Sequence, residues 1–336
     1  MPLPLIQDRL LCLQLGEAAS FKNLSLFPLL DGTPGCPDYL TLEEALQAGL
    51  VSITEVDESG TVNQLKVTNR APQAVLIVDG EELVGAKQNR VVNLTILVPP
   101  EQTIVIPVTC VEQGRWRHVS REFRTSRQTM DAMMRARKSR QVYYHLQALG
   151  EAAADQMALW EDIATLSMNT GVYSPTGAMS DIYAHHELTL RDYERAFQLL
   201  DGQVGALFAI NGHIVSLDVF DYAATFARFF PKLLRSVALD AIAYFQPQFA
   251  PLSREAAWEF IQRVAHADAR GFPTVGEGED VRLQAAGVIG SALVARGRVV
   301  HLCAFAMPDD ASMSDERTYE LFTSLSRPSA RLRWRW

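Results

Sequence analysis

The stretch from Ala74 to Val111, AVLIVDGEELVGAKQNRVVNLTILVPPEQTIVIPVTCV, decides the fold class of this chain. Three runs rich in β-branched residues favour strands there, at 74–78, 91–98 and 103–111. Asp79-Gly80 and Pro99-Pro100 supply the turn chemistry between these runs. We therefore predict a group of neighbouring strands in the first third of the chain.

The segments before this stretch extend the pattern. Short apolar segments predict further strands at 11–15, 24–30, 51–56 and 62–67, and the last two form a hairpin because apolar and polar residues alternate around a turn. Thr41 and Glu44 have the spacing of a capping box, which predicts a short helix that ends at Gly49.

The hydrophobic period becomes helical in the middle of the chain. Apolar residues follow one helical face from 127 to 166, so we predict a long central helix. The part from Arg135 to Gln141 has almost no apolar residue, and we expect it to face solvent. The segment 167–186 lacks periodicity, which predicts a loop of about twenty residues.

The last third contains a possible internal repeat. Val204–Phe220 aligns without gaps on Ile289–Phe305, and each copy is two apolar strands around Asn-Gly or Arg-Gly, the composition of a tight hairpin turn. Two hairpins of similar composition would also align by chance. Helices are predicted between them at 223–243, broken at Pro231, and at 253–267.

These patterns together predict an α+β fold, because runs of strands are followed by strands packed on helices. We expect four parts along the chain: a β-rich part with the polar motifs, a long helix with a flexible loop, an α+β part with the two similar hairpins, and a C-terminal tail, at 1–125, 126–187, 188–310 and 311–336.

Composition excludes several classes of protein. The 336 residues are 48% hydrophobic and 21% charged, which is ordinary for globular chains. We expect no membrane span, because no run reaches roughly 18 to 20 apolar residues, and the chain start lacks the features of a signal peptide, which predicts a cytoplasmic protein. Four dispersed cysteines without a Cys-x-x-Cys pair predict reduced thiols and no zinc site, and we expect no metal site.

Positive charge gathers in one segment. The net charge is −8, yet residues 115–140 hold nine basic residues and two acidic ones. The remaining 22 basic and 37 acidic residues give −15, so we expect the protein as a whole to repel nucleic acid. The basic segment predicts either a solvated helical face or a surface for an anionic small molecule or an acidic protein.

The densest group of polar residues is DGEELVGAKQNR at 79–90. It holds acids, a lysine, an amide pair and an arginine beside predicted strands, and its glycines allow close approach of a ligand to the backbone. The candidate ligand-binding residues are Glu81, Glu82, Lys87, Gln88, Asn89 and Arg90. A hairpin with a polar turn and solvated charges is the alternative.

A second group follows the strand at 103–111. Glu112, Arg115 and Trp116 are ligand candidates, since an Arg fork fits phosphates or carboxylates and a Trp ring offers a stacking face. Cys110 is either a nucleophile or a small core residue. Asp218 and Asp221 are weaker candidates, Asp221 being also a helix N-cap candidate. Pairing of the intervening strands is expected to bring the groups at 79–90 and 112–116 together.

At Gly80-Glu81-Glu82, Lys87 to Arg90, Pro107 to Trp116 and Leu217 to Asp221, the chain resembles a known bacterial family, the ARG and Rhodanese-Phosphatase-superfamily-associated protein domain. The resemblance extends to about Phe305. The family's association with ADP-ribosylglycohydrolases and phosphatase-like enzymes implies a link to ADP-ribose or nucleotide metabolism. It supplies no established catalytic residue or cofactor.

Three hypotheses about function follow. The first is a binding module for an anionic, nucleotide-like ligand, ADP-ribose-related by the resemblance. The second is an interaction or scaffold protein that uses the long helix, the loop at 167–186 and the C-terminal Arg-Leu-Arg-Trp-Arg-Trp segment. The third is a metal-assisted hydrolase or transferase that uses Glu81 or Glu82 as acid or base, which requires the two carboxylates to converge. The sequence does not separate an enzyme from a binding protein.

Overall fold

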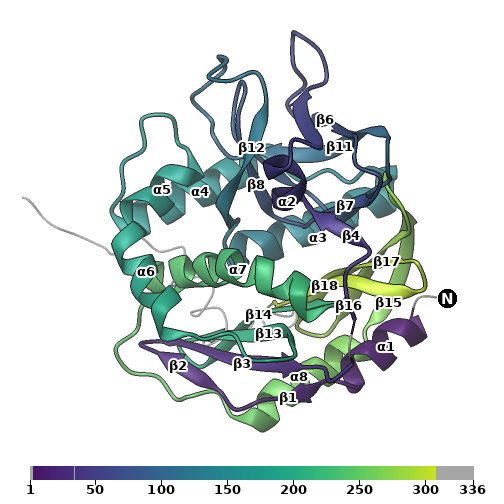
Figure 1. Cartoon of the computed structure of the whole chain (residues 1–336). Coiled ribbons are helices and arrows are strands. Elements are labelled where there is room, and N and C mark those ends of the chain that lie inside the picture. Colours follow the sequence, from purple (N-terminus) through teal and green to yellow (C-terminus); the bar gives the residue numbers. More distant parts are fainter. Residues whose placement is uncertain (1–2, 34, 308–336) are drawn as a thin grey trace, which may run out of the picture.

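The computed structural model describes residues 3–33 and 35–307, and its helices and strands form an α+β fold, as predicted (Figure 1). The helices are α1 (Leu3–Leu11), α2 (Leu42–Gln47), α3 (Ala132–Leu149), α4 (Gln156–Thr170), α5 (Met179–His185), α6 (Glu187–Ala196), α7 (Ala223–Ala243) and α8 (Arg254–Ala265). The tail predicted at 311–336 lies outside the described residues.

One large antiparallel sheet gathers strands from both ends of the chain. Its order is β1-β3-β13-β14-β18-β17-β16-β15, with β2 also paired to β3. These strands are β1 (Gln14–Leu15), β2 (Ala19–Phe21), β3 (Leu24–Leu30), β13 (Gln203–Ile210), β14 (His213–Phe220), β15 (Asp268–Pro273), β16 (Glu279–Ala285), β17 (Val288–Ala295) and β18 (Arg298–Ala306).

Two smaller sheets are built from residues 74–111 and from strands that precede and follow this segment. The six-stranded sheet has the order β12-β8-β9-β11-β6-β5, and the three-stranded sheet has the order β10-β7-β4. These strands are β4 (Tyr39–Thr41), β5 (Val51–Glu55), β6 (Gln64–Asn69), β7 (Ala74–Ile77), β8 (Glu81–Gly85), β9 (Arg90–Val92), β10 (Ile96–Val98), β11 (Thr103–Cys110) and β12 (Phe123–Thr129).

Helices fill the space between the sheets. Figure 1 shows α3 and α7 between the large sheet and the N-terminal strands, and α7 contacts both β13 and β12. Helices α1 and α8 pack on each other and against the large sheet. The architecture is therefore layered, and α3 and α7 each touch strands from distant parts of the sequence.

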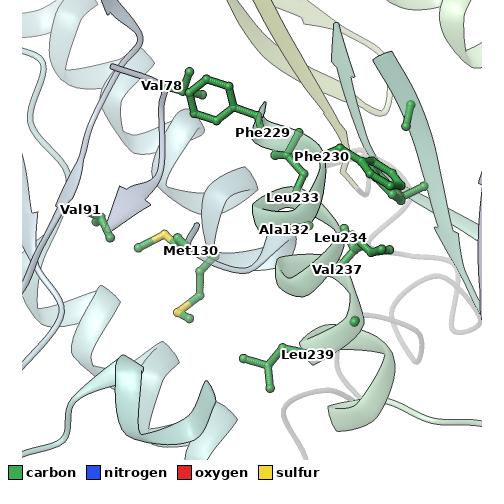
Figure 2. Packing of buried hydrophobic residues seen from close by; sticks show 14 of the residues in the cluster. Val78, Val91, Met130, Ala132, Phe229, Phe230, Leu233, Leu234, Val237 and Leu239 are labelled. Atoms are coloured by element: carbon green, nitrogen blue, oxygen red, sulfur yellow. The ribbon is translucent and has the colours of Figure 1, made fainter. Parts of the chain in front are cut away.

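Helix α7 occupies the centre of the largest hydrophobic cluster. In Figure 2, Phe229 points toward Val78, whereas Phe230 points toward the strands on the opposite side of the helix. Burial of each such side chain stabilises the fold by roughly 1.5–3 kcal/mol. The helix continues through Pro231, so the predicted break is wrong; the missing N–H costs one backbone hydrogen bond, and packing on both sides maintains the helix.

The two predicted hairpins are present and lie side by side in the large sheet. Asn211-Gly212 and Arg296-Gly297 form their turns, and all four residues have positive φ angles between 51° and 78°. Two such residues in succession are the requirement of a type I′ turn. The second strands of the hairpins, β14 and β18, pair with each other, so the similar segments are neighbours in one sheet.

The central helical segment differs from its prediction. Residues 123–129 form β12, and the expected long helix is divided into α3 and α4. Gly150 ends α3 in a left-handed conformation, and Asp155 caps the start of α4 by accepting hydrogen bonds from two backbone N–H groups. The loop predicted at 167–186 is also shorter, because α4 continues to Thr170 and α5 begins at Met179.

Two further expectations are corrected. Residues 135–141 are not a solvated face, since Arg135 and Lys138 are buried. The strand expected at 11–15 is mostly the end of α1 and a turn, and only Gln14–Leu15 pairs as a strand. None of the described helices is both long enough and apolar enough to cross a membrane.

Candidate functional site

Strand pairing brings the two polar groups of the sequence together. Strand β9 lies between β8 and β11, and Arg90 pairs with Leu83 on one side and with Cys110 on the other. The residues after β8 and the residues after β11 therefore leave the sheet next to each other. An isolated bridge between Glu112 and Ala178 adds the loop before α5 to this region.

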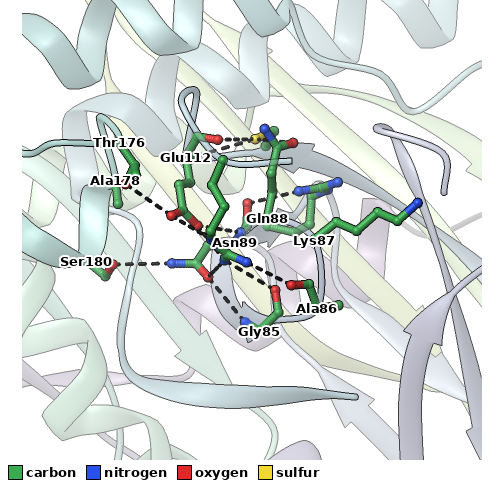
Figure 3. Close-up of polar contacts among 12 residues, drawn as sticks. Gly85, Ala86, Lys87, Gln88, Asn89, Glu112, Thr176, Ala178 and Ser180 are labelled. Atoms are coloured by element: carbon green, nitrogen blue, oxygen red, sulfur yellow. Dashed lines mark hydrogen bonds and ion pairs between the residues drawn. The ribbon is translucent and has the colours of Figure 1, made fainter. Parts of the chain in front are cut away.

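Glu112, Arg115 and Asn89 form a closed hydrogen-bonded group, of which Figure 3 labels Glu112 and Asn89. Arg115 donates to both oxygens of Glu112, from Nε at 2.8 Å and from Nη2 at 2.6 Å, and to Asn89 Oδ1 at 3.0 Å. Burial opposes ionisation of Glu112, but the Arg115 fork and the Asn89 backbone N–H outweigh it and hold the pKa of the carboxyl below its usual value. Arg115 is thus committed to internal contacts.

Gln88 and Cys110 are hydrogen-bonded to each other next to this group. The thiol of Cys110 donates to Gln88 Oε1 at 3.1 Å, and the Gln156 amide bonds both the N–H and the C=O of Cys110. The side chain of Cys110 is fully buried, and burial raises the pKa of its thiol. A raised pKa disfavours the thiolate, so the structure favours the interpretation of Cys110 as a small core residue over its interpretation as a nucleophile.

Lys87, Arg90 and Trp116 form a different group on the other side. Figure 3 shows Lys87 pointing away from Glu112. The Trp116 ring lies 5.3 Å from Lys87 Nζ and 5.7 Å from Arg90 Cζ, and 48% of this residue is exposed. The Trp116 ring therefore stacks on two cations while keeping much of its surface in solvent.

The residues between β5 and β6, 56–63, cover both cations with backbone carbonyls; we call them the β5–β6 loop. Lys87 Nζ donates to the carbonyls of Glu58 and Ser59 at 2.6 and 2.5 Å, and Arg90 Nε donates to the carbonyl of Val62 at 2.9 Å. Arg90 is fully buried, and its Nη2 has no hydrogen-bond partner in the described structure.

Glu81 and Glu82 do not converge. Adjacent residues of a strand face opposite sides, and these two carboxylates have separate partners. Glu81 Oε1 pairs with Lys232 of α7 at 3.0 Å, whereas Glu82 Oε2 accepts from Gln128 Nε2 at 2.8 Å. Neither faces bulk water, since both are fully buried.

A family model described as the ARG and Rhodanese-Phosphatase-superfamily-associated Protein domain, ARPP-1, matches residues 12–305. The chain belongs to the ARPP-1 family. No curated protein matches it. Among solved structures, the crystal structure of an inactive mutant of CurK dehydratase is 11% identical over 88% of this chain and 98% of that chain, with a TM-score of 0.14.

The region matched by the ARPP-1 model also contains a buried charged network that the sequence analysis missed. Asp79 pairs with Lys138 and lies 3.6 Å from Arg135 Nε, and Arg135 donates to both oxygens of Asp218 at 2.8 and 3.2 Å. His301 Nε2 lies 3.3 Å from Asp218 Oδ1. Burial opposes ionisation of Asp218, yet the Arg135 charge lowers the pKa of this carboxyl to about 2.

The signal for this network was present as helical spacing. Arg135, Lys138, Val142 and Leu146 lie three or four residues apart, so the buried face of α3 continues beyond its apolar part. Every charge of the network is paired, which is the usual condition for burying charges. The network therefore has the character of a structural core.

The weaker candidates in this ARPP-1 member have structural partners. Asp221 does not cap α7, because it accepts hydrogen bonds from Tyr39 and Arg298. No cluster of three or more His, Cys, Asp or Glu among residues 3–33 and 35–307 is placed to hold a metal ion.

Proposed function

We propose that this protein binds an anionic, nucleotide-like ligand at Lys87, Arg90 and Trp116. The observation that carries the proposal is the state of Arg90. Its guanidinium is fully buried, its Nη2 has no partner in the described residues, and its other hydrogen bonds go to the carbonyls of Val62 and Asn89.

A buried cation of this kind is unfavourable unless an anion compensates it. Removing a charge from water costs several kcal/mol, which carbonyl dipoles offset in part and a carboxylate or phosphate offsets more fully. Burial lowers the pKa of Arg90, and the charges of Glu55 and Glu112 oppose this effect only in part. Lys87 Nζ has carbonyl partners as well, and Lys87 Nζ and Arg90 Cζ lie 5.3 and 5.7 Å from the Trp116 ring centroid, so an anionic group bound near this ring would interact with both cations.

The Trp116 ring supports the nucleotide-like part of the proposal. An exposed aromatic face next to phosphate-binding cations is the arrangement on which a base can stack, and such stacking contributes about 1–3 kcal/mol. Exposed Arg117, Arg121 and Arg124 follow in the chain and would attract an anion toward the site. Compounds related to ADP-ribose are the first to test, because of the association implied by the family.

The experiment is isothermal titration with ADP-ribose, AMP and ribose 5-phosphate on the whole chain and on Lys87→Gln and Trp116→Ala. Losing a cation or the stacking face should weaken binding about tenfold or more. Lys22→Gln is the matched control, because Lys22 is exposed and lies 5.3 Å over the Phe21 and Tyr193 rings, far from the site in sequence. Absence of binding to all three compounds, or equal weakening by the control, would refute the proposal.

A further inference from the structure

Glu55, at the end of β5, is a second buried group with an unpaired atom, and it lies near the same cations. Only 6% of the residue is exposed. Its Oε1 accepts the backbone N–H of Lys87 at 3.3 Å, and its Oε2 has no hydrogen-bond partner among the described residues. A buried carboxylate oxygen that accepts no hydrogen bond costs free energy, because its lost hydration is not replaced. The unpaired Nη2 of Arg90 carries the same kind of cost, since it is a buried donor without an acceptor.

The free oxygen of Glu55 and the ammonium group of Lys87 both lie close to Gly60. A Cβ built on Gly60 would lie 3.4 Å from Glu55 Oε2 and 3.3 Å from Lys87 Nζ, so both groups meet beneath the β5–β6 loop at Gly60. The nearby cations nevertheless direct their hydrogen bonds elsewhere. Lys87 Nζ donates to the carbonyls of Glu58 and Ser59, and Arg90 Nε donates to that of Val62.

An anion site with a free carboxylate imposes a condition on its ligand. A fully ionised anion brings only acceptors, so its oxygens would be attracted by Lys87 and Arg90 and repelled by Glu55. A ligand that also carries O–H donors removes the repulsion, because a hydroxyl donates to the carboxylate and fills its empty acceptor position. Hydrogen bonds to an ionised partner are the stronger ones, so this contact contributes to selectivity.

We infer that the ligand is a phosphate ester of a sugar or polyol, whose phosphate binds Lys87 and Arg90 and whose free hydroxyls bind Glu55. The inference rests on the proposed function and adds the chemical class of the ligand. It distinguishes sugar phosphates and nucleotides from inorganic anions and from esters without hydroxyls. Glu55 is a binding residue in this scheme, and no bond is made or broken.

The test compares AMP with 2′,3′-dideoxy-AMP, which keeps the base and the phosphate and lacks both ribose hydroxyls. By titration calorimetry, the unaltered chain should bind AMP about tenfold or more tightly than the dideoxy compound. Glu55→Gln should abolish most of this preference by weakening AMP alone. Glu58→Gln is the matched control and should retain the preference, because Glu58 lies in the same loop with an exposed side chain and contributes only its carbonyl.

The outcomes separate the inference from the proposed function. Equal binding of AMP and the dideoxy compound to the unaltered chain would overturn the inference and leave the anion site intact. Binding of inorganic phosphate as tight as that of AMP, with no binding of sulfate, would also overturn it, because the donor would then be the phosphate itself. If neither nucleotide, ribose 5-phosphate nor inorganic phosphate binds, the proposed function fails as well. Thermal melts of Glu55→Gln verify that the variant is folded.

Discussion

Replacing Glu82 by Gln should stabilise the protein in a pH-dependent way. Glu82 is fully buried, its Oε2 accepts from Gln128 at 2.8 Å, and its Oε1 has no partner in the described structure. Burial, with smaller effects of the Glu112 and Asp181 charges, raises the pKa of this carboxyl from 4.5 to about 7 despite the hydrogen bond from Gln128. Glutamine keeps the shape of the side chain and cannot ionise.

The sign and size follow from proton linkage. Between pH 4.5 and about 7 the folded chain holds a proton at Glu82 that the unfolded chain has lost, so stability falls as the pH rises through this window. One pKa unit corresponds to about 1.4 kcal/mol, so the total loss is about 3 kcal/mol. Glu82→Gln removes this loss. The free energy of unfolding of the variant should therefore exceed that of the unaltered chain by about 3 kcal/mol at pH 8, with little difference near pH 4.5.

The assay is urea unfolding of both chains at several pH values, with the midpoint compared at constant m-value. Glu122→Gln, at an exposed position just before β12, should show no such pH-dependent gain. An equal difference in stability at pH 5 and pH 8 would refute the reasoning, because a packing effect does not depend on a proton. A Glu82→Gln chain that is less stable at pH 8 would show that the ionised carboxylate makes favourable contacts in the fold.

Three further predictions concern the buried polar groups. Asp218→Asn should destabilise the protein by about 3–5 kcal/mol in urea unfolding, because Arg135 would keep its charge with a weakened partner; replacing both residues by apolar ones should cost less than the single change. Burial raises the pKa of Asp131 to about 6, and burial with the charge of Asp131 raises that of Asp240, so stability should fall as the pH rises from 3.8 through about 6; thermal melts of Asp240→Asn should show a flatter pH dependence. Gly80→Ala should lower the melting temperature, since Gly80 has φ of 83° and an added Cβ would lie 3.0 Å from Arg135 Cδ; an unchanged melting temperature would refute this, because the φ angle strains an alanine even where Arg135 moves.

Local patterns predicted most strands and the hairpin turns, because β-branched runs and Asn-Gly or Arg-Gly pairs act within a few residues. The single strand predicted at 91–98 was wrong, since these residues are divided between β9 and β10, which belong to different sheets. The helical middle was harder. Gly150 was a visible stop signal, yet the apolar period on its two sides suggested a single helix. Arg135 and Lys138 were misjudged because periodicity counts apolar residues, and the buried face of α3 is charged where Asp79 and Asp218 meet it.

The sequence predicted where the candidate site lies, but it predicted few of the contacts within the site. Pairing of β8, β9 and β11 brings Asn89 close to Glu112, as the order of strands suggested. Arg90 and Arg115 belong to separate groups because Arg90 contacts the β5–β6 loop, which is remote from it in the sequence. Arg90 meets Val62 and Glu81 meets Lys232 only in the folded chain, and no spacing rule connects residues so far apart.

The charged face of α3 has a consequence for how the molecule folds and unfolds. Asp79 comes from the N-terminal strands and Asp218 from the first C-terminal hairpin, and Arg135 and Lys138 connect them through one helix. Detaching either the N-terminal strands or the C-terminal hairpin from α3 would leave a charge buried without its partner. We therefore expect these parts to unfold in one cooperative transition. Contacts that span so much of the chain also raise the contact order, which predicts slow folding that ends when α3 docks.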